Sequence, residues 1–157
     1  MPLKRHPALA PLSREHHHAL LLARGLQRGV SSHLRAELPS DPPALAAHVC
    51  AYFDTHLTPH FRAEELVMDA VRAGDPELVE ACRVVASEHA RLGQMIDSLR
   101  QPMEAGAQLD QLDRFGALLE AHVRSEERSL YEGVQRCLDD DALSALGAAI
   151  ERLHAHP

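Results

Sequence analysis

The sequence predicts an all-α fold: an up-down-up-down four-helix bundle with a short additional C-terminal helix. Five segments carry apolar residues at the helical spacing of three and four positions. Short linkers containing Pro, Gly and Asp separate them, as expected between antiparallel neighbours in a bundle. Aromatic residues make up only 3% of the chain and Trp is absent, so the core must consist of Leu, Ala and Val, which favours helices over a β-sandwich.

The first two predicted helices flank a proline-rich turn at residues 39–43. The first should begin near Ser13, a suitable N-cap, and end at about Leu38, with a weak point at Gly29. The second should span residues 43–73. Pro59 lies inside the second helix and is expected to kink it or break it locally, because proline has no amide hydrogen to donate.

The other three predicted helices span residues 76–99, 109–138 and 141–153. The acidic run at residues 139–141 introduces the last of them and suits a helix N-terminus, where the helix dipole favours negative charge. A chain of 157 residues suits one domain. We therefore expect a single domain over residues 1–157, with its core in residues 12–138.

Composition excludes several functional classes. The formal net charge of −7 comes without a basic stripe or an aromatic platform, so no nucleic-acid partner is expected. No apolar run approaches the roughly 18 residues of a membrane span, and the N-terminus lacks the apolar core of a signal peptide. The three cysteines are far apart and form no CxxC motif, which is typical of reduced thiols in a cytoplasmic protein. The pattern does not predict an oligomeric state.

Two copies of an HxxxE motif, His60/Glu64 and His122/Glu126, fall on the apolar stripes of the second and fourth long helices. Residues four apart lie on one helix face, one turn apart, so each pair can reach the same point. A buried carboxylate without a partner is costly, and a metal ion would supply that partner. A solitary HxxxE pair is usually solvated, but two copies on alternate helices favour a buried metal site.

The other two long helices each bring one histidine to the inner face. With them, the candidate metal ligands are His16, His60, Glu64, His89, His122 and Glu126. Imidazoles and carboxylates without thiolates suit iron, manganese or zinc. Helical bundles hold di-metal sites between facing helices in this way.

Several neighbouring residues compete for roles in this site. His17 rivals His16 because it also precedes an apolar residue by three positions, although the apolar register favours His16. His18 is expected to be solvated. His56 lies one turn before His60 and could be an additional ligand or an outer partner, although a polar position near the end of the bundle is favoured.

Glu65 and Glu127 each follow a candidate ligand directly and are rotated from it by about 100° around the helix. They are expected to face solvent or to pair with arginines. Tyr131 could hydrogen-bond near the site or pack in the core, and the sequence leaves both roles open.

Four blocks of the chain together resemble the hemerythrin-like, or HHE cation-binding, family over about residues 12–134. These blocks are Leu12–His16, His60–Glu65, Ser87–His89 and His122–Glu127. The resemblance implies two iron ions bridged by Glu64, Glu126 and an oxo or hydroxo group, with manganese or zinc as possible substitutes. It implies as terminal ligands His16, His60, His89 and His122.

The chain departs from the oxygen-carrying members of that family in two places. Those members have a further histidine one turn after the third-helix ligand, where this chain has Gly93. Their last motif is HxxxxD, where this chain has HxxxE. The chain is more similar to bacterial members linked to iron–sulfur repair and nitric-oxide stress, so simple reversible oxygen carriage is not the leading expectation.

The leading expectation is a cytoplasmic diiron protein that binds or senses dioxygen, nitric oxide or peroxide at an open iron position. The alternatives are a diiron oxidoreductase for nitric oxide or peroxide, an iron-storing or iron-donating protein, and a helical interaction module without metal. No GxGxxG or P-loop motif occurs, so no nucleotide cofactor is implied. The sequence does not decide whether the protein is an enzyme.

Overall fold

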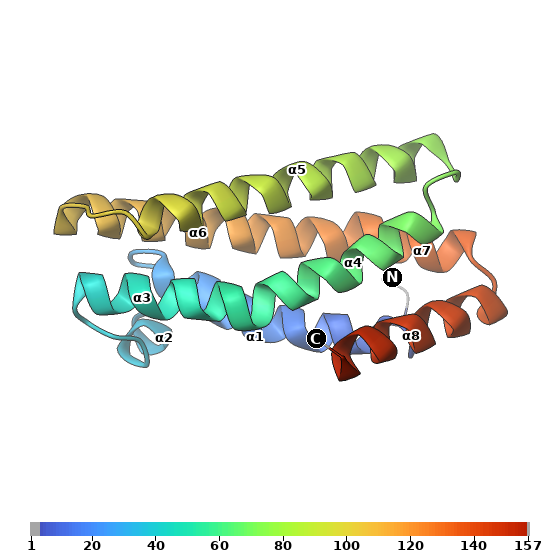
Figure 1. Cartoon of the computed structure of the whole chain (residues 1–157), viewed down its shortest axis with the longest axis horizontal. Helices are drawn as coiled ribbons and strands as arrows, with labels where there is room; N and C mark the ends of the chain where they lie inside the picture. Colours follow the sequence, from blue (N-terminus) through green and yellow to red (C-terminus); the bar gives the residue numbers. More distant parts are fainter. Residues whose placement is uncertain (1–3, 157) are drawn as a thin grey trace.

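The computed structural model describes residues 4–156, and helices account for all of their regular secondary structure (Figure 1). The predicted all-α class is confirmed, since residues 4–156 contain no strand. In chain order the elements are α1 (Ala10–Leu26), α2 (Ser32–Ala36), α3 (Pro42–Tyr52), η1 (Phe53–Leu57), α4 (Thr58–Ala70), α5 (Pro76–Leu99), α6 (Ala105–Ser125), η2 (Glu126–Leu130), α7 (Tyr131–Cys137) and α8 (Asp140–Ala155). The two η elements are single π-helical turns, in which backbone hydrogen bonds link residues five apart.

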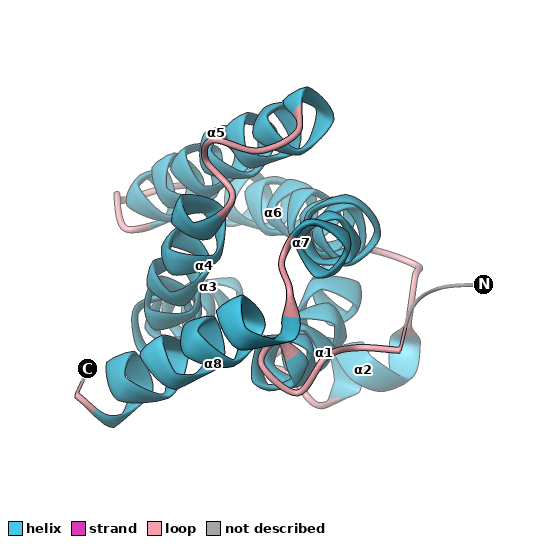
Figure 2. Ribbon diagram, turned by 90° about the vertical axis from the view of Figure 1, so that its right-hand side faces the viewer, coloured by secondary structure: helices cyan, strands magenta, loops and turns pink. Residues whose placement is uncertain are grey.

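Four helical rods lie side by side. α3, η1 and α4 form one continuous rod, and α6, η2 and α7 form another. With α1 and α5 they surround a common interior, which Figure 2 shows end-on. α1 packs along α6, while α5 packs on both α6 and α3. α8 turns back along α4 at one end of the molecule (Figure 1).

Acidic side chains cap three of the long helices. Asp75 caps α5, which spans Pro76–Leu99 as predicted. Asp139 caps α8, which begins one residue before its predicted start. Glu104 caps α6, and this helix therefore begins four residues before the predicted residue 109. Each carboxylate accepts a hydrogen bond from the backbone amides that a helix N-terminus leaves free.

The prediction for the first helix is wrong at both ends. α1 begins before Ser13, whose hydroxyl does not cap the helix but donates to Glu127 Oε1 at 2.7 Å. The helix ends at Leu26 instead of continuing to Leu38. Gly29 then takes a φ of 74°, a left-handed conformation that glycine adopts without steric cost. The remainder of the predicted helix forms the separate, short α2.

The predicted interruption near Pro59 takes the form of a π-helical turn. The Thr58 amide donates to the Phe53 carbonyl, five residues earlier. Pro59 then falls in the first turn of α4, where its missing amide hydrogen leaves no helical bond unmade. A second π-helical turn, closed by the Tyr131 amide and the Glu126 carbonyl, interrupts the fourth predicted helix without a proline to mark it.

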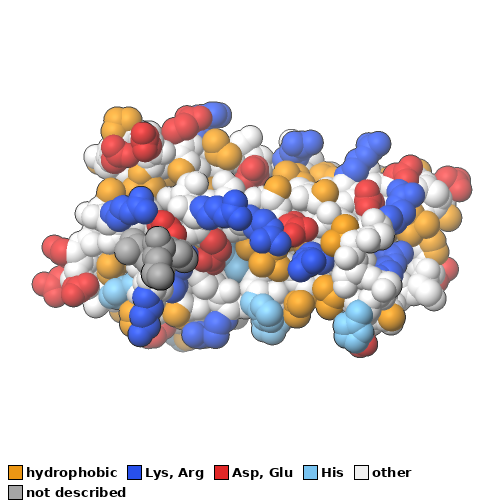
Figure 3. Space-filling model, turned by 180° about the vertical axis from the view of Figure 1, so that it is seen from behind, with side chains coloured by type: hydrophobic (Ala, Val, Ile, Leu, Met, Phe, Trp, Pro, Cys, Tyr) orange, Lys and Arg blue, Asp and Glu red, His pale blue; other side chains and the backbone are white. Residues whose placement is uncertain are grey.

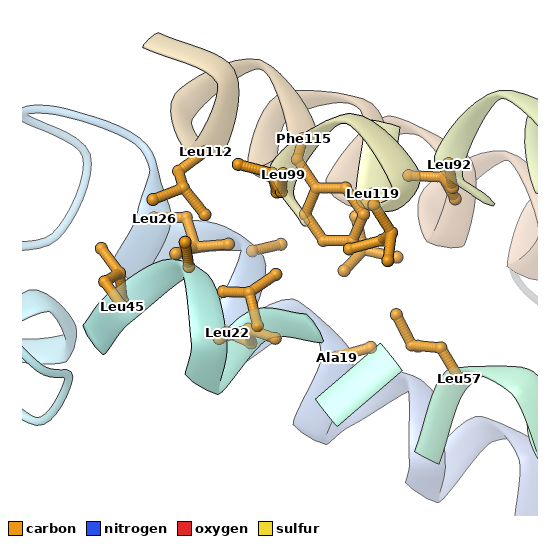
Figure 4. Packing of buried hydrophobic residues seen from close by; sticks show 14 of the residues in the cluster. Ala19, Leu22, Leu26, Leu45, Leu57, Leu92, Leu99, Leu112, Phe115 and Leu119 are labelled. Carbon is orange, nitrogen blue, oxygen red and sulfur yellow. The ribbon is translucent and has the colours of Figure 1, made fainter. Parts of the chain in front are cut away.

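Buried apolar side chains form two clusters, one towards each end of the rods. Figure 4 shows the first cluster, in which α1, α3, α5 and α6 pack around Phe115 and Leu119. The second cluster gathers side chains of α1, α4, α5, α7 and α8 around Tyr131 and Ile150. A belt of polar side chains separates the two clusters, and it contains the buried His16, His60, Glu64, His122 and Glu126 and the partly buried His89. The polar belt therefore lies within the core and not at its rim.

α8 covers the second apolar cluster. Its side chains Leu143, Leu146 and Ile150 are buried in that cluster, and the helix packs on α4. Gly147 lies so close to the N-terminal segment that an added Cβ would come within 3.0 Å of Ala8 Cα. The C-terminal helix is therefore an integral part of the hydrophobic core.

Replacing Ile150 by Ala should lower the free energy of unfolding by about 2–5 kcal/mol, the usual cost of emptying a buried aliphatic site. The Ile150 side chain is almost fully buried, at 1% exposed. Urea denaturation followed by circular dichroism measures the change. The control is its exposed neighbour, since Glu151→Ala should change the free energy of unfolding by less than ~0.5 kcal/mol. Equal stability of the two variants would contradict the packing of α8 on the bundle.

Charges of both signs are interspersed on the surface, as the face in Figure 3 shows. Arg124 pairs with Glu120 at 2.6 Å within α6, and Arg28 pairs with Asp110. Such pairs near solvent contribute little to stability. Among residues 4–156, no helix has both the length and the apolar character needed to cross a membrane.

Candidate metal centre

Six side chains from the four rods converge in the polar belt. They are His16 of α1, His60 and Glu64 of α4, His89 of α5, His122 of α6, and Glu126 at the start of η2. Both carboxylates are 0% exposed, and three of the imidazole side chains are 1–3% exposed. The His89 side chain is 11% exposed. The structure thus brings together all six residues that the sequence suggested as metal ligands.

Glu64 contacts three imidazoles through their Nε2 atoms. Its Oε1 lies 3.1 Å from His60 Nε2 and 3.3 Å from His16 Nε2. Its Oε2 lies 3.1 Å from His89 Nε2. The two oxygens of this one carboxylate therefore face histidines from three different rods.

Glu126 repeats this arrangement from the opposite rod. Its Oε2 lies 3.1 Å from His16 Nε2 and 3.2 Å from His122 Nε2. Its Oε1 lies 3.6 Å from His89 Nε2. Both glutamates consequently stand between His16 of α1 and His89 of α5.

The donor atoms form two overlapping sets, each able to hold one metal ion. One set is His16, His60, Glu64 and Glu126, and the other is Glu64, His89, His122 and Glu126. Within each set the donor atoms lie within 4.8 Å of one another. Metal–nitrogen and metal–oxygen bonds of about 2.0–2.2 Å place ligands on opposite sides of an ion about 4 Å apart, so the spacing fits. Because both glutamates belong to both sets, they are suited to bridge two ions.

The hydrogen bonding of these atoms supports the same conclusion. Six of them have no hydrogen-bond partner among residues 4–156: His60 Nε2, His89 Nε2, His122 Nε2, Glu64 Oε2, Glu126 Oε1 and Glu126 Oε2. Among these atoms, nitrogen and oxygen approach one another to 3.1–3.6 Å without forming a hydrogen bond. Buried polar atoms are normally paired, so unpaired nitrogen and oxygen atoms aimed at one space fit metal ions.

Carboxylates on the outer side orient three of the four imidazoles. His16 Nδ1 lies 2.7 Å from Glu127 Oε1, and His60 Nδ1 lies 2.5 Å from Glu15 Oε2. His122 Nδ1 lies 2.8 Å from Glu88 Oε2. A carboxylate that accepts the outer ring N–H fixes the tautomer and leaves Nε2 free for a metal, as is usual for metal-bound histidines.

The sequence analysis missed these outer carboxylates. Glu15 and Glu88 each precede a belt histidine directly, yet each reaches a histidine on a neighbouring rod. The expectation that Glu127 pairs with an arginine is confirmed by Arg5, whose guanidinium donates to it at 2.5 Å. That expectation was incomplete, because Glu127 also holds His16. The signal in the sequence was that each of these three glutamates directly neighbours a candidate metal ligand.

Tyr131 completes the inner hydrogen bonding. Its hydroxyl donates to Glu64 Oε1 at 2.5 Å and lies 3.5 Å from His16 Nε2. Its ring stacks on the His16 ring with centroids 5.2 Å apart, and the Arg5 guanidinium lies 5.3 Å from its centroid. Burial and the nearby Glu64 carboxylate raise the pKa of Tyr131 well above its ordinary value. The phenol therefore remains a proton donor to Glu64 and serves both the site and the core.

The belt residues strongly perturb one another's protonation. Burial lowers the pKa of His60, but the charge of Glu64 and the hydrogen bond to Glu15 outweigh burial and raise it to about 9. Burial likewise opposes a charge on His89, whereas Glu126 and Glu64 raise its pKa to about 9. These histidines hold protons against the buried carboxylates, and a metal ion that binds them displaces those protons.

The competing residues lie outside the belt. His17 and His18 are exposed, and their rings contact each other at 5.7 Å between centroids. His56 is exposed and stacks on Tyr52 at 4.6 Å between ring centroids. Glu65 is exposed, as expected. Of the three consecutive histidines in α1, the structure brings only His16 into contact with the buried carboxylates.

Comparison with known proteins gives a match to one family model. No curated protein and no solved structure matches this chain. Residues 7–134 match a family model described as the hemerythrin HHE cation binding domain. That region covers well over half of the 157 residues and contains all six belt residues. The chain therefore belongs to the hemerythrin HHE cation-binding family, and its cluster of histidines and glutamates fits a metal site.

Proposed function

We propose that this protein holds two iron ions in the polar belt and binds or senses a small molecule there: dioxygen, nitric oxide or peroxide. The observation that carries this proposal is the sharing of Glu64 and Glu126 by both four-ligand sets. Two shared carboxylates are suited to hold two ions as neighbours. A mixed imidazole and carboxylate ligand set without thiolates suits iron, with manganese or zinc as possible substitutes.

In the proposed centre each ion would be held by two imidazoles and by the two shared glutamates. His16 and His60 serve one ion, and His89 and His122 serve the other. Iron commonly accepts more ligands than these four, so positions remain for a small molecule. When bound, such an iron pair can bind a small ligand and exchange electrons with it.

The surrounding residues have separate tasks in this proposal. Tyr131 donates to Glu64 and holds that carboxylate where it would serve both ions. Glu127, Glu15 and Glu88 accept the outer protons of three imidazoles and so keep the inner nitrogens free. The apolar clusters on both sides of the belt exclude water, which strengthens the electrostatic interactions within it.

We further infer that the centre lies in an up-down-up-down four-helix bundle with an additional C-terminal helix, formed by one domain over residues 1–157. The short connections between α4 and α5 and between α5 and α6 support this topology. A cytoplasmic location is part of the same proposal. The three cysteines, which form no disulfide, are consistent with a reducing compartment.

Elemental analysis of the purified protein tests the proposal, combined with optical spectra of the anaerobically reduced and then air-exposed sample. We expect about two iron ions per chain, and near-ultraviolet absorption of a ferric pair after exposure to air. Metal below about 0.2 ion per chain, not restored by ferrous iron, would contradict the proposal, since such a ligand set should bind metal tightly.

The same reduced sample distinguishes among the small molecules. Separate additions of dioxygen, nitric oxide and peroxide should each be followed optically and by consumption of the added molecule. A stoichiometric spectral change with one of them identifies the ligand. Sustained consumption over many equivalents of nitric oxide or peroxide would replace the binding proposal with an oxidoreductase.

A further inference from the structure

The four belt histidines differ on their outer side. His16, His60 and His122 each meet a carboxylate at Nδ1 within 2.5–2.8 Å. No such hydrogen bond joins His89 Nδ1 to another residue within 4–156. The His89 side chain is also the most exposed of the four, at 11% against 1–3%. The side of the centre at His89 is therefore held less firmly and covered less completely than the other sides.

That side opens into a groove between α4 and α5. The groove has a volume of about 880 Å³, and its lining includes His89, Phe61 and Ala86. α4 and α5 do not pack closely against each other. α5 packs on α6 and α3 instead. The Phe61 ring stacks on the His89 ring with centroids 3.8 Å apart and planes 18° apart. His89 Nε2 in turn lies 3.1 Å from Glu64 Oε2, so the stacked pair connects the groove lining to a carboxylate of the belt.

A second pocket reaches His60 between α1 and the rod of α3, η1 and α4, but an ion pair closes it. It has a volume of about 380 Å³, and His60 and Glu15 are among the residues that line it. One oxygen of Glu15 covers His60 Nδ1 at 2.5 Å, and the other lies 3.5 Å from His154 Nε2 of α8. The His60 side chain is only 3% exposed. This approach is consequently blocked by groups that also orient a ligand.

The charges in the larger groove do not favour one sign strongly. Arg72 is paired with Asp69, and Arg83 is paired with Glu80. The lining also contains Arg62 and Glu65, which have opposite charges, and most of its other side chains are apolar or small. Such a groove carries no strong field of one sign, so it neither repels a small cation nor concentrates a large anion.

We propose that the groove between α4 and α5 is the entrance to the metal centre, and that His89 and Phe61 form its gate. It admits metal ions and planar or diatomic molecules up to about the size of imidazole. A small rotation of the His89 ring, which no outer carboxylate opposes, opens the way. This inference rests on the proposed metal centre, so its tests use protein whose metal content has been measured first.

Rescue by free imidazole tests whether the groove leads to the position of the His89 ring. His89→Ala should weaken metal binding at least ~10-fold, as loss of a ligand should cost no less than loss of an outer partner. Added imidazole should enter through the groove, stack on Phe61 and restore the iron content towards that of the wild type. The matched control is His122→Ala, whose ring site is 1% exposed and covered by Glu88, and imidazole should not restore it.

Either of two results would overturn the inference: rescue of both variants to the same extent, or rescue of neither. Failure of the proposed centre itself has a different signature, because the wild-type protein would then hold no iron pair. The rescue is read from metal content and not from activity.

A second experiment does not depend on removing a ligand. Ala86 is exposed, lines the groove and precedes His89 by three residues on the same helix face. Ala86→Phe should slow the removal of ferrous iron by a soluble chelator several-fold, with the same starting metal content. Phe61→Ala should accelerate it. Ala121→Phe adds the same ring at an exposed site of α6 next to His122 and should leave the rate unchanged. Equal rates in Ala86→Phe and the wild type would place the entrance elsewhere.

Discussion

Replacing Glu64 by Ala should abolish the paired metal centre and lower the iron content from about two ions per chain to well below one. Glu64 belongs to both four-ligand sets, so its loss removes one ligand from each ion and the bridge between them. Glu126→Ala should have the same effect for the same reason. Elemental analysis after loading with ferrous iron measures the result, and circular dichroism confirms that the helices remain.

Two further variants separate loss of the bridge from general damage. Glu64→Gln keeps the side-chain volume and an oxygen that can accept from Tyr131, but it removes the negative charge. It should therefore fold normally and still lose the metal pair. His18→Ala changes an exposed histidine two residues from His16 and should retain the full iron content. Two irons per chain in Glu64→Ala or Glu126→Ala would rule out the bridging assignment.

The six belt residues could be found from the sequence because the α-helix has a regular period. His60 and Glu64 are four residues apart, and so are His122 and Glu126. Each pair therefore had to share a face, and the apolar residues around it showed that the face was buried. His89 gave the same indication between apolar neighbours on the third long helix. Local periodicity thus sufficed for these five residues, whereas in the first helix it favoured His16 but left His17 as a rival.

Tyr131 could not be assigned in this way, because the helix changes its period at that point. In an α-helix a residue five positions after Glu126 would be turned about 140° away from it. The π-helical turn over residues 126–130 brings Tyr131 back to the interior, where it is fully buried beside Glu64. Nothing in the local sequence, such as a proline, marks this turn. π-Helical turns are frequent at functional sites, and this one supplies a donor that an α-helix would not.

The outer carboxylates were missed for a different reason. The partners of Glu15 and Glu88 lie on other rods, 45 and 34 residues away in the chain. Which histidine each carboxylate meets depends on how neighbouring helices are rotated and displaced against each other. That information belongs to tertiary packing, and helical periodicity does not contain it. The same limitation explains why Ser13, a good N-cap by residue type, instead donates to Glu127.

The buried belt imposes a cost that the rest of the fold must offset. Two carboxylates and four imidazoles occupy the middle of a core that would otherwise be continuous. Buried charges of this kind destabilise a fold unless they are paired. α8 helps to offset the cost, because it adds apolar side chains to the second cluster. The matched family region ends at residue 134, before this helix begins.

Removing the outer partner of a belt histidine should weaken metal binding without removing any ligand. Glu88 accepts from His122 Nδ1 at 2.8 Å and is itself 23% exposed, so its loss costs little packing. Glu88→Ala frees the imidazole to rotate or to move its proton to Nε2, where it competes with the metal. The affinity for ferrous iron should fall about 10–100-fold, measured by competition with a chelator of known affinity. Glu88→Gln keeps an acceptor oxygen, so its affinity for ferrous iron should lie between that of Glu88→Ala and that of the wild type.

The matched control for this effect lies on the same helix. Glu80→Ala removes an exposed glutamate that pairs with Arg83, so the change in net charge is the same as in Glu88→Ala. If the long-range charge of the protein determined the affinity, both variants would weaken it equally. If the orientation of His122 determines the affinity, only Glu88→Ala will weaken it. An unchanged affinity in Glu88→Ala would mean that the packing of His122 against Phe61 and His89 holds the ring without its carboxylate. In that case the missing outer carboxylate would not explain why the His89 ring is proposed to rotate. The exposure of His89 to the groove alone would have to explain that rotation.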